Sequence, residues 1–242
     1  MTEQIGLFET MYSCRAMRRL HPDPVPEEQL LLLVDAANQA PSGRNFQRGR
    51  WIIVRDDQQK RRIAELNRRA SEEAARQQAE HGEPLPHHDV EKRRRMWEAV
   101  LWQSEHMHEA PAIIVACAVL DHPGQDPNRY ASSIWPGIQN LLLAARASGL
   151  GAVSTTYALS LRAELHEVLG LPNDVAAQAI IPVGYPIGNF GPVTRRPVQE
   201  ITTFDRWDGP SPNFVAPTAR STLAATKFVE STASDRETAV DG

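Results

Sequence analysis

Two strongly apolar runs constrain the fold more than any other feature of the sequence. They are PAIIVACAVL at 111–120 and AQAIIPVGYP at 177–186. Short apolar runs without polar alternation are typical of strands that are buried on both faces. We therefore expect two buried strands here, and we expect the first of them to be central in its sheet.

Between these runs the chain alternates between helical and strand patterns, which indicates an α+β fold. EEQLLLLVDAANQA follows Pro26, a good first helical residue, and keeps its apolar residues on one face. The run at 131–149 is apolar nearly all round and indicates a core or interface helix. The other expected elements are a buried strand at 50–56, solvated helices at 57–80 and 89–109 that form a candidate lid, a short strand at 152–156 and a helix at 160–170.

Composition narrows the class of protein. The 242 residues carry a formal net charge of -4, which argues against a general nucleic-acid binder. Cys14 and Cys117 cannot form a disulfide framework, and Cys117 lies in an apolar run, where a small buried residue is expected. No signal-peptide pattern and no run long enough to span a bilayer is found, so we expect a soluble cytoplasmic protein with no membrane partner.

Common catalytic motifs are missing from the sequence. There is no G-x-G-x-x-G turn, no Walker lysine, no G-x-S-x-G elbow and no H-E-x-x-H. His106 and His108 are two residues apart and face different directions on a helix, so solvated lid residues are favoured over a metal site; the same holds for the other lid histidines, His81, His87 and His88. Cys14 lies among cations that would lower its pKa, yet no partner base is near, so a nucleophilic role is disfavoured.

Four short segments carry a stronger signal when they are taken together. CRAMR at 14–18 offers guanidinium groups, which match phosphate geometry. PSGRNFQ at 41–47 is a turn with side-chain amides and exposed backbone donors, and GLGAVSTT at 149–156 is a glycine turn that leads into hydroxyl side chains. RRP at 195–197 follows a glycine-rich loop. Each segment is weak alone, but their order and spacing are specific.

This ordered set, over residues from about 8 to 203, resembles the nitroreductase family of FMN-dependent flavoproteins. TTYALSLRAELHEVLGLP looks most like the iodotyrosine-deiodinase branch of that family. The resemblance implies an α+β fold with a central mixed sheet flanked by helices and with FMN at a homodimer interface. It also implies an FMN-binding domain at 1–203, into which the polar helices at about 57–109 would form a lid-like insertion. The composition of residues 204–242, rich in Pro, Ser, Thr and Ala, predicts a C-terminal arm or tail that is partly disordered.

The resemblance assigns roles to individual residues. Arg15 and Arg195 would bind the FMN phosphate, and Arg18 would lie at the pyrimidine edge, where a cation stabilises the negative charge of the reduced flavin. The other implied cofactor-binding residues are Ala16, Ser42, Gly43, Asn45, Ser154, Thr155 and Thr156, whereas Arg19 is expected to be a surface residue. Cys14 and Ala16 depart from the arginine and serine that are common in this motif. QRGRW likewise replaces the typical Q-P-W.

The activity implied is an FMN-dependent NAD(P)H oxidoreductase that reduces a nitroaromatic, a quinone or a similar electron-poor compound by ping-pong hydride transfer. No side chain is required as an acid, so we expect no catalytic residue and no metal. Three alternatives remain open: a specialised flavin enzyme such as a reductive dehalogenase, a non-catalytic FMN-binding protein, and a metal-dependent hydrolase that uses the lid histidines. The acceptor and the choice among NADH, NADPH and a deazaflavin donor are not determined by the sequence.

Overall fold

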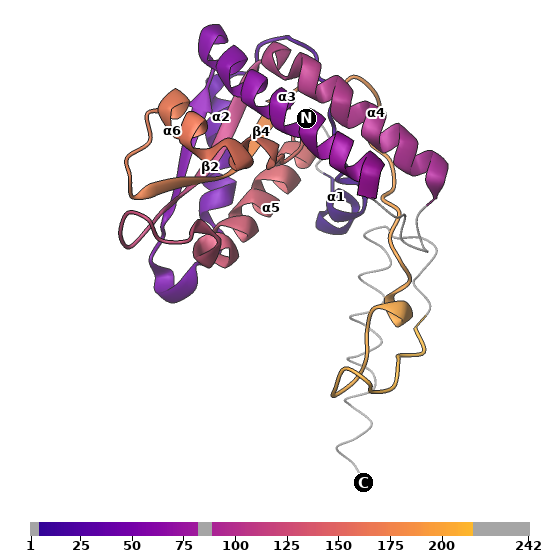
Figure 1. The fold of residues 1–242 in the computed structure, drawn as a ribbon. Helices are drawn as coiled ribbons and strands as arrows, with labels where there is room; N and C mark the ends of the chain where they lie inside the picture. The colour runs from indigo at the N-terminus through magenta and orange to yellow at the C-terminus, as the bar shows by residue number, and fades with distance from the viewer. Residues whose placement is uncertain (1–4, 82–88, 215–242) are drawn as a thin grey trace. The chain divides into compact units, whose positions relative to one another are not determined.

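The structure, a computed structural model, describes residues 5–81 and 89–214. The described residues divide into two compact units, one of Ala16–Asn189 and a smaller one of 5–15 with 190–214. The larger unit is built on a four-stranded sheet in the order β1-β2-β4-β3 (Figure 1). Its strands are β1 (Gly49–Val54), β2 (Ala112–Val119), β3 (Gly151–Ala152) and β4 (Val175–Gly184).

Every described strand pair in this sheet is antiparallel. β1 pairs with β2, β2 with β4, and β3 with β4. β2 and β3 therefore run in the same direction, with β4 inserted between them. The α+β class is confirmed, whereas the described sheet is antiparallel instead of mixed.

The position of each strand in the sheet decides how deeply it is buried. β2 and β4 are central, and all but one residue of each is buried, as the apolar runs predicted. β1 is an edge strand, so Trp51, Ile52 and Ile53 are only half-buried and the prediction of a buried strand was wrong there. The short strand predicted at 152–156 is reduced to β3, with Thr155 adding one isolated bridge to Ile180.

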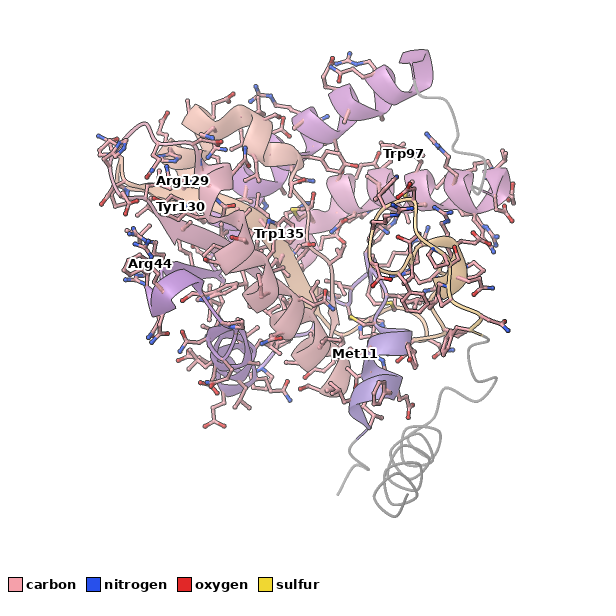
Figure 2. All side chains as sticks on the ribbon, turned by 90° about the horizontal axis from the view of Figure 1, so that it is seen from below. Met11, Arg44, Trp97, Arg129, Tyr130 and Trp135 are labelled. Atoms are coloured by element: carbon pink, nitrogen blue, oxygen red, sulfur yellow. The ribbon has the colours of Figure 1, made fainter. Side chains whose placement is uncertain are left out.

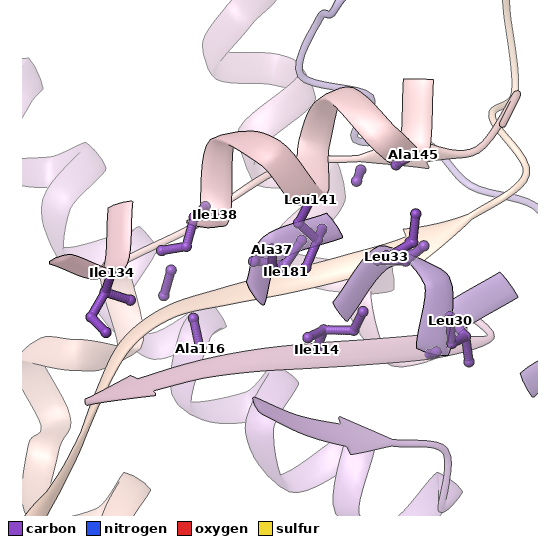
Figure 3. Packing of buried hydrophobic residues seen from close by; sticks show 14 of the residues in the cluster. Leu30, Leu33, Ala37, Ile114, Ala116, Ile134, Ile138, Leu141, Ala145 and Ile181 are labelled. Carbon is purple, nitrogen blue, oxygen red and sulfur yellow. The ribbon is translucent and has the colours of Figure 1, made fainter. Parts of the chain in front are cut away.

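One face of the sheet is covered by α2 (Glu27–Asn38) and α5 (Ala131–Ala147). Alternate β2 residues such as Ile114 and Ala116 point to this face, because successive side chains of a strand point to opposite sides. Figure 3 shows side chains of α5 packed over the sheet beside residues of α2. The labelled core residues are Leu30, Leu33, Ala37, Ile114, Ala116, Ile134, Ile138, Leu141, Ala145 and Ile181.

The opposite face is covered by α3 (Asp57–His81), by α6 (Arg162–Leu169) and by the 3-10 helix η4 (Tyr157–Leu161). Ile113, Val115 and Cys117 of β2 point to this side. α4 (Val90–His106) packs against α3, and the 3-10 helix η2 (Met107–Glu109) follows it. The two helices predicted at 57–80 and 89–109 are confirmed, and residues 82–88 between them lie outside the described residues.

Buried polar contacts hold α3 in place at two points along its length. The Lys60 ammonium donates to the Ala110 carbonyl at 2.9 Å, although the side chain is almost fully buried. The Ser71 and Ser104 hydroxyls lie 2.7 Å apart in a buried hydrogen bond that joins α3 to α4. Because breaking a buried polar contact leaves unsatisfied groups, these residues fix the base of the candidate lid.

The smaller unit contains α1 (Leu7–Ser13) and the 3-10 helix η5 (Val198–Glu200). The Val193 N–H donates to the Tyr12 carbonyl at 2.9 Å, which joins its two chain segments. Residues 204–214 contain no helix or strand. The remainder of the predicted C-terminal arm lies outside the described residues, and the predicted division at 203 and 204 stays a prediction. No helix in the described ranges is long and apolar enough to cross a membrane.

Gly137 offers a test of the contact between α2 and α5. A Cβ atom at this position would lie 2.9 Å from the Ala37 carbonyl oxygen, which is backbone and cannot rotate away. We expect Gly137→Ala to lower the free energy of unfolding by about 1–3 kcal/mol through overpacking, less a gain of about 1 kcal/mol in helix propensity. Urea denaturation measures the change. Gly49→Ala is the control, because its Cβ would meet its neighbours at an ordinary 3.7 Å; equal losses for both variants would contradict this packing.

Candidate functional site

The segment Ala16–Leu20 lies along the edge of the sheet that carries β3. The Met17 N–H donates to the Ala152 carbonyl at 3.3 Å, and Leu20 forms an isolated bridge with Pro186. Gly151 permits this approach, since a Cβ there would lie 2.8 Å from the Leu20 side chain. The structure therefore brings the last residues of the motif CRAMR, 16–18, beside the motif GLGAVSTT.

Arg18 is a half-buried cation without a compensating partner. Among the described residues its guanidinium makes no hydrogen bond and no ion pair. Burial lowers the pKa of Arg18, and an electrostatic interaction with Tyr157 opposes this in part. A guanidinium that is removed from water needs an acceptor, so this position is suited to a ligand that carries negative charge or carbonyl oxygens.

Gln103 of α4 lines the same small cavity as Arg18. Its side chain is 5% exposed, and its Nε2 has no hydrogen-bond partner. The sequence analysis missed this residue. A signal existed, because Gln103 falls on the buried stripe of α4 with Val100 and Met107, at the spacing of one helix face. Two donors without acceptors therefore face one cavity.

Neighbouring side chains form the outer part of this cavity. Trp102 and His106 stack with ring centroids 4.2 Å apart, and both line the cavity. The Arg19 guanidinium lies 5.5 Å from the Trp102 ring centroid. Arg19 is exposed, in agreement with its predicted surface role, whereas Arg18 points into the protein.

The three side chains of the segment 154–156 differ in their burial and in their contacts. Thr155 is buried, and its hydroxyl donates to Asn67 Oδ1 at 3.0 Å. Its backbone exchanges two hydrogen bonds with Ile180 of β4, so Thr155 holds the segment in place. Ser154 is half-buried and Thr156 is exposed. Thr156 lines a groove of about 570 Å³ together with Tyr157 and Ser160 of η4 and with charged residues of α3, namely Arg69, Glu72, Glu73 and Arg76.

The turn at 42–47 is stabilised by its own side chains. The Ser42 hydroxyl accepts from the Gln47 N–H at 3.0 Å, and the Gln47 amide donates to Asn45 Oδ1 at 3.1 Å. Arg44, Asn45 and Gln47 all have positive φ values, between 50° and 55°. Left-handed backbone at three non-glycine residues is costly, and such strain is concentrated at functional sites. The backbone strain supports the prediction that this turn binds a ligand.

The predicted residues of the larger unit do not gather at one place in a single chain. The Gly43 N–H donates to the Ser133 hydroxyl at 3.1 Å, in the first turn of α5. Gly151 and the segment beside Arg18 follow the last turn of the same helix. A helix of 17 residues is about 25 Å long, so the turn and the Arg18 segment belong to opposite ends of α5.

Three predicted residues lie at or next to the boundary between the units. Arg15 and Arg195 belong to the smaller unit, and Ala16 is an exposed residue that begins the larger one. Within the smaller unit, a Cβ at Gly191 would lie 3.6 Å from the Arg15 guanidinium. Arg195 is exposed and donates to the Thr194 carbonyl at 2.8 Å. Neither arginine forms an ion pair with a described residue of this unit.

The cysteines and histidines offer little chemistry in the part of the chain that the structure describes. Burial raises the pKa of the Cys117 thiol to about 12, which confirms it as an inert core residue. Cys14 is half-buried. Residues 5–81 and 89–214 contain no group of three or more His, Cys, Asp or Glu that could hold a metal ion. His87 and His88 lie outside the described residues.

The sequence model of the Nitroreductase family matches residues 12–185, which include the sheet, the Arg18 cavity and the 42–47 turn. The chain therefore belongs to the Nitroreductase family.

Individual relatives agree with this assignment. The chain is 28% identical to an iodotyrosine deiodinase of Thermotoga neapolitana over 184 residues, 74% of this chain and 88% of that protein. It is 33% identical to an NADH dehydrogenase of Thermus thermophilus over 221 residues, 77% of this chain and 90% of the relative. A crystal structure of oxidized iodotyrosine deiodinase bound to FMN and 3-iodo-L-tyrosine has the same fold, with a TM-score of 0.67 and 24% identity, over 84% of this chain and 100% of that one.

The unsatisfied amide of Gln103 leads to a prediction for the protein without a ligand. Gln103→Leu removes a buried donor that has no acceptor, so we expect the free energy of unfolding to rise by about 1 kcal/mol. Gln178→Leu is a matched control. Gln178 is also 5% exposed, but its Nε2 donates to the Pro127 carbonyl at 3.1 Å, so the same substitution should be destabilising. Urea denaturation of both variants, after removal of bound ligands, compares them. A loss of stability in Gln103→Leu equal to that in Gln178→Leu would be the contrary result.

Proposed function

We propose that the protein is an FMN-dependent oxidoreductase that takes reducing equivalents from NAD(P)H and reduces an electron-poor small molecule. The observation that carries this proposal is the pair of uncompensated donors, Arg18 and Gln103, at one cavity. The pyrimidine ring of a flavin presents carbonyl oxygens and ring nitrogens that accept hydrogen bonds. The donors present thus have the chemistry to bind the edge of that ring, which would lie at the rim of the cavity, because a cavity of about 10 Å³ cannot contain the ring itself.

The remaining roles follow from the chemistry of each side chain. Arg15 and Arg195, which lack carboxylate partners within their unit, would bind the FMN phosphate, since a phosphate dianion needs more than one charge-assisted donor. Ser42, Gly43 and Asn45 would line the isoalloxazine ring. Ser154 and Thr156 would lie near the ring, while Thr155 would act through its bond to Asn67 and hold the backbone of this segment.

A complete site requires two chains. The 42–47 turn and the Arg18 segment belong to opposite ends of α5, so one copy cannot present both to a single flavin. A homodimer resolves this, because the turn of one copy can meet the Arg18 segment of the other. Exposed apolar side chains on α2, Leu31 and Leu32, are available for burial in such an interface.

When it is bound, FMN supplies the redox chemistry, accepting a hydride from the nicotinamide and returning it to the acceptor. Residues of the chain would position the reactants and set the electrostatic environment of the cofactor. Arg18 would place a positive charge beside the negative charge of the reduced cofactor, and its partial burial would strengthen that interaction. The groove beside Thr156 and Tyr157, closed on its other side by α3, is large enough for an aromatic acceptor.

Reductive dehalogenation is the second candidate reaction. Its support is the identity of 28% with a protein named iodotyrosine deiodinase, which covers 88% of that relative. The groove presents guanidinium and carboxylate groups of α3 beside the Tyr157 ring, a mixture suited to a charged aromatic compound. Turnover of halogenated phenols and of nitroaromatics, measured with the same reduced enzyme, separates the two reactions. A protein that binds FMN but is reduced by neither NADH nor NADPH would instead be a non-catalytic binder.

The first prediction from this proposal concerns the presence of FMN and the binding of its phosphate. The purified protein should show the absorption spectrum of FMN, and NAD(P)H should bleach it without oxygen. Arg195→Ala should weaken FMN binding by about 1.5–3 kcal/mol, because a charge-assisted hydrogen bond is lost. Fluorescence titration of the apoprotein measures this change. Arg206→Ala is the control, since that exposed arginine pairs with Asp208. A protein that stays colourless after addition of FMN would contradict the proposal as a whole.

The second prediction concerns Arg18. Arg18→Leu removes a positive charge near the reduced cofactor, so the midpoint potential of bound FMN should fall by about 30–60 mV, or about 1.4–2.8 kcal/mol for two electrons. Arg19→Leu makes the same change at the adjacent, exposed residue and should shift the potential far less. Redox titration against a reference dye measures both. Equal shifts would show that only general charge matters and would remove the assignment of Arg18.

A further inference from the structure

A second group of cations, outside the Arg18 cavity, surrounds the 42–47 turn. The turn contacts the start of α5 through the hydrogen bond from Gly43 to Ser133. The Arg48 guanidinium lies 5.0 Å from the ring centroid of Phe46 and 5.2 Å from that of Tyr130, which ends the 3-10 helix η3 (Pro127–Tyr130). These contacts join two distant stretches into one surface, defined by Arg44, Phe46, Arg129 and Trp135 and called here the arginine–aromatic surface.

Figure 2 shows Arg44, Arg129, Tyr130 and Trp135 on the same part of the larger unit. Arg44 and Arg129 are exposed, and neither of them forms an ion pair within residues 5–81 and 89–214. The nearby carboxylate is already engaged, because Asp121 accepts from the Tyr130 hydroxyl at 2.7 Å and pairs with Arg48. In a chain with a net charge of -4, this surface is a local concentration of unpaired positive charge.

Exposed aromatic rings lie among these cations. The Phe46 side chain is 56% exposed and that of Trp135 is 38% exposed. Flat rings beside guanidinium groups are the combination that binds a phosphorylated heteroaromatic compound, since the rings stack on a base and the guanidiniums bind phosphate. Arg44 is held on this surface in a left-handed conformation, with φ of 52°, that an arginine rarely adopts. Conformational strain of this kind destabilises the fold, and strained residues are concentrated at binding and active sites.

We propose that the arginine–aromatic surface binds the adenosine part of NADPH, with Arg44 and Arg129 contacting its 2′-phosphate, and that the enzyme thereby selects NADPH over NADH. The inference rests on the proposed function, because it assigns the adenosine end of the same electron donor. Arg44 belongs to the turn whose other residues would line the flavin, so a nicotinamide stacked there would carry its phosphates outward past this turn. Two exposed arginines suit one phosphate dianion, whereas an extended nucleic acid would meet the acidic remainder of the chain.

Binding of two nucleotides, measured by calorimetry on the FMN-loaded protein, tests the proposal without catalysis. The probes are 2′,5′-ADP, which carries the distinguishing phosphate, and 5′-AMP, which lacks it. We expect 2′,5′-ADP to bind at least tenfold more tightly. Arg44→Ala combined with Arg129→Ala should remove that preference and leave 5′-AMP binding nearly unchanged. Arg62→Ala, which removes an exposed arginine of α3, is the matched control and should retain the preference.

Anaerobic reduction of the flavin provides the second measurement. In the double variant the KM for NADPH should rise by about tenfold to a hundredfold, as expected for loss of charge-assisted contacts to a phosphate, while the KM for NADH should stay the same. Equal binding of both nucleotides by the unaltered protein overturns the inference. So does a double variant that becomes monomeric while keeping its preference, because the surface would then be a contact between copies. Preferential 2′,5′-ADP binding with no flavin reduction by either donor would retain this surface and reject the proposed function.

Discussion

The pairing of β2 with β4 is the constraint on which the rest of the larger unit depends. Both strands are apolar on both faces, so the sheet must be covered by helices on each side. α2 and α5 cover one face and α3 with α6 cover the other, which divides the core into two clusters. β3 is short and pairs only with the C-terminal end of β4. The segment that carries Arg18 lies along this edge of the sheet.

The candidate site combines residues whose hydrogen bonds are satisfied with residues whose buried donors have no acceptor. The Thr155 hydroxyl donates a buried hydrogen bond to Asn67 and so joins the sheet edge to α3. Lys60 fixes the start of that helix through its hydrogen bond to a backbone carbonyl. These satisfied contacts hold the backbone around the cavity. Arg18 and Gln103 lie in this well-packed setting without acceptors, which destabilises the chain in isolation. Ligand binding would supply the missing acceptors and shift the folding equilibrium toward the native state.

Sequence patterns predicted the helices and strands that depend on local periodicity. They failed for burial and side-chain partners, which depend on residues distant in the sequence. The apolar runs identified β2 and β4, and α5 ends within two residues of its predicted bound. The burial of β1 was predicted wrongly because an edge position is set by strand order, which the sequence of that strand does not encode. The motifs indicated Arg18, but they could not show that it lacks a carboxylate partner. Gln103 was missed because a glutamine on a helix face is ordinarily solvated.

Charge placement separates the two groups of arginines in physical terms. α3 and α4 carry arginines that pair with glutamates three or four residues away, such as Arg68 with Glu65 and Glu72, and these pairs contribute to solubility and helix stability. The arginines of the 42–47 turn and of η3 have no such partners at helical spacing, because the segments are too short to provide them. An exposed cation without a partner costs the fold little. Several of them gathered beside exposed rings and a strained turn create a positive field that steers anionic ligands toward one place.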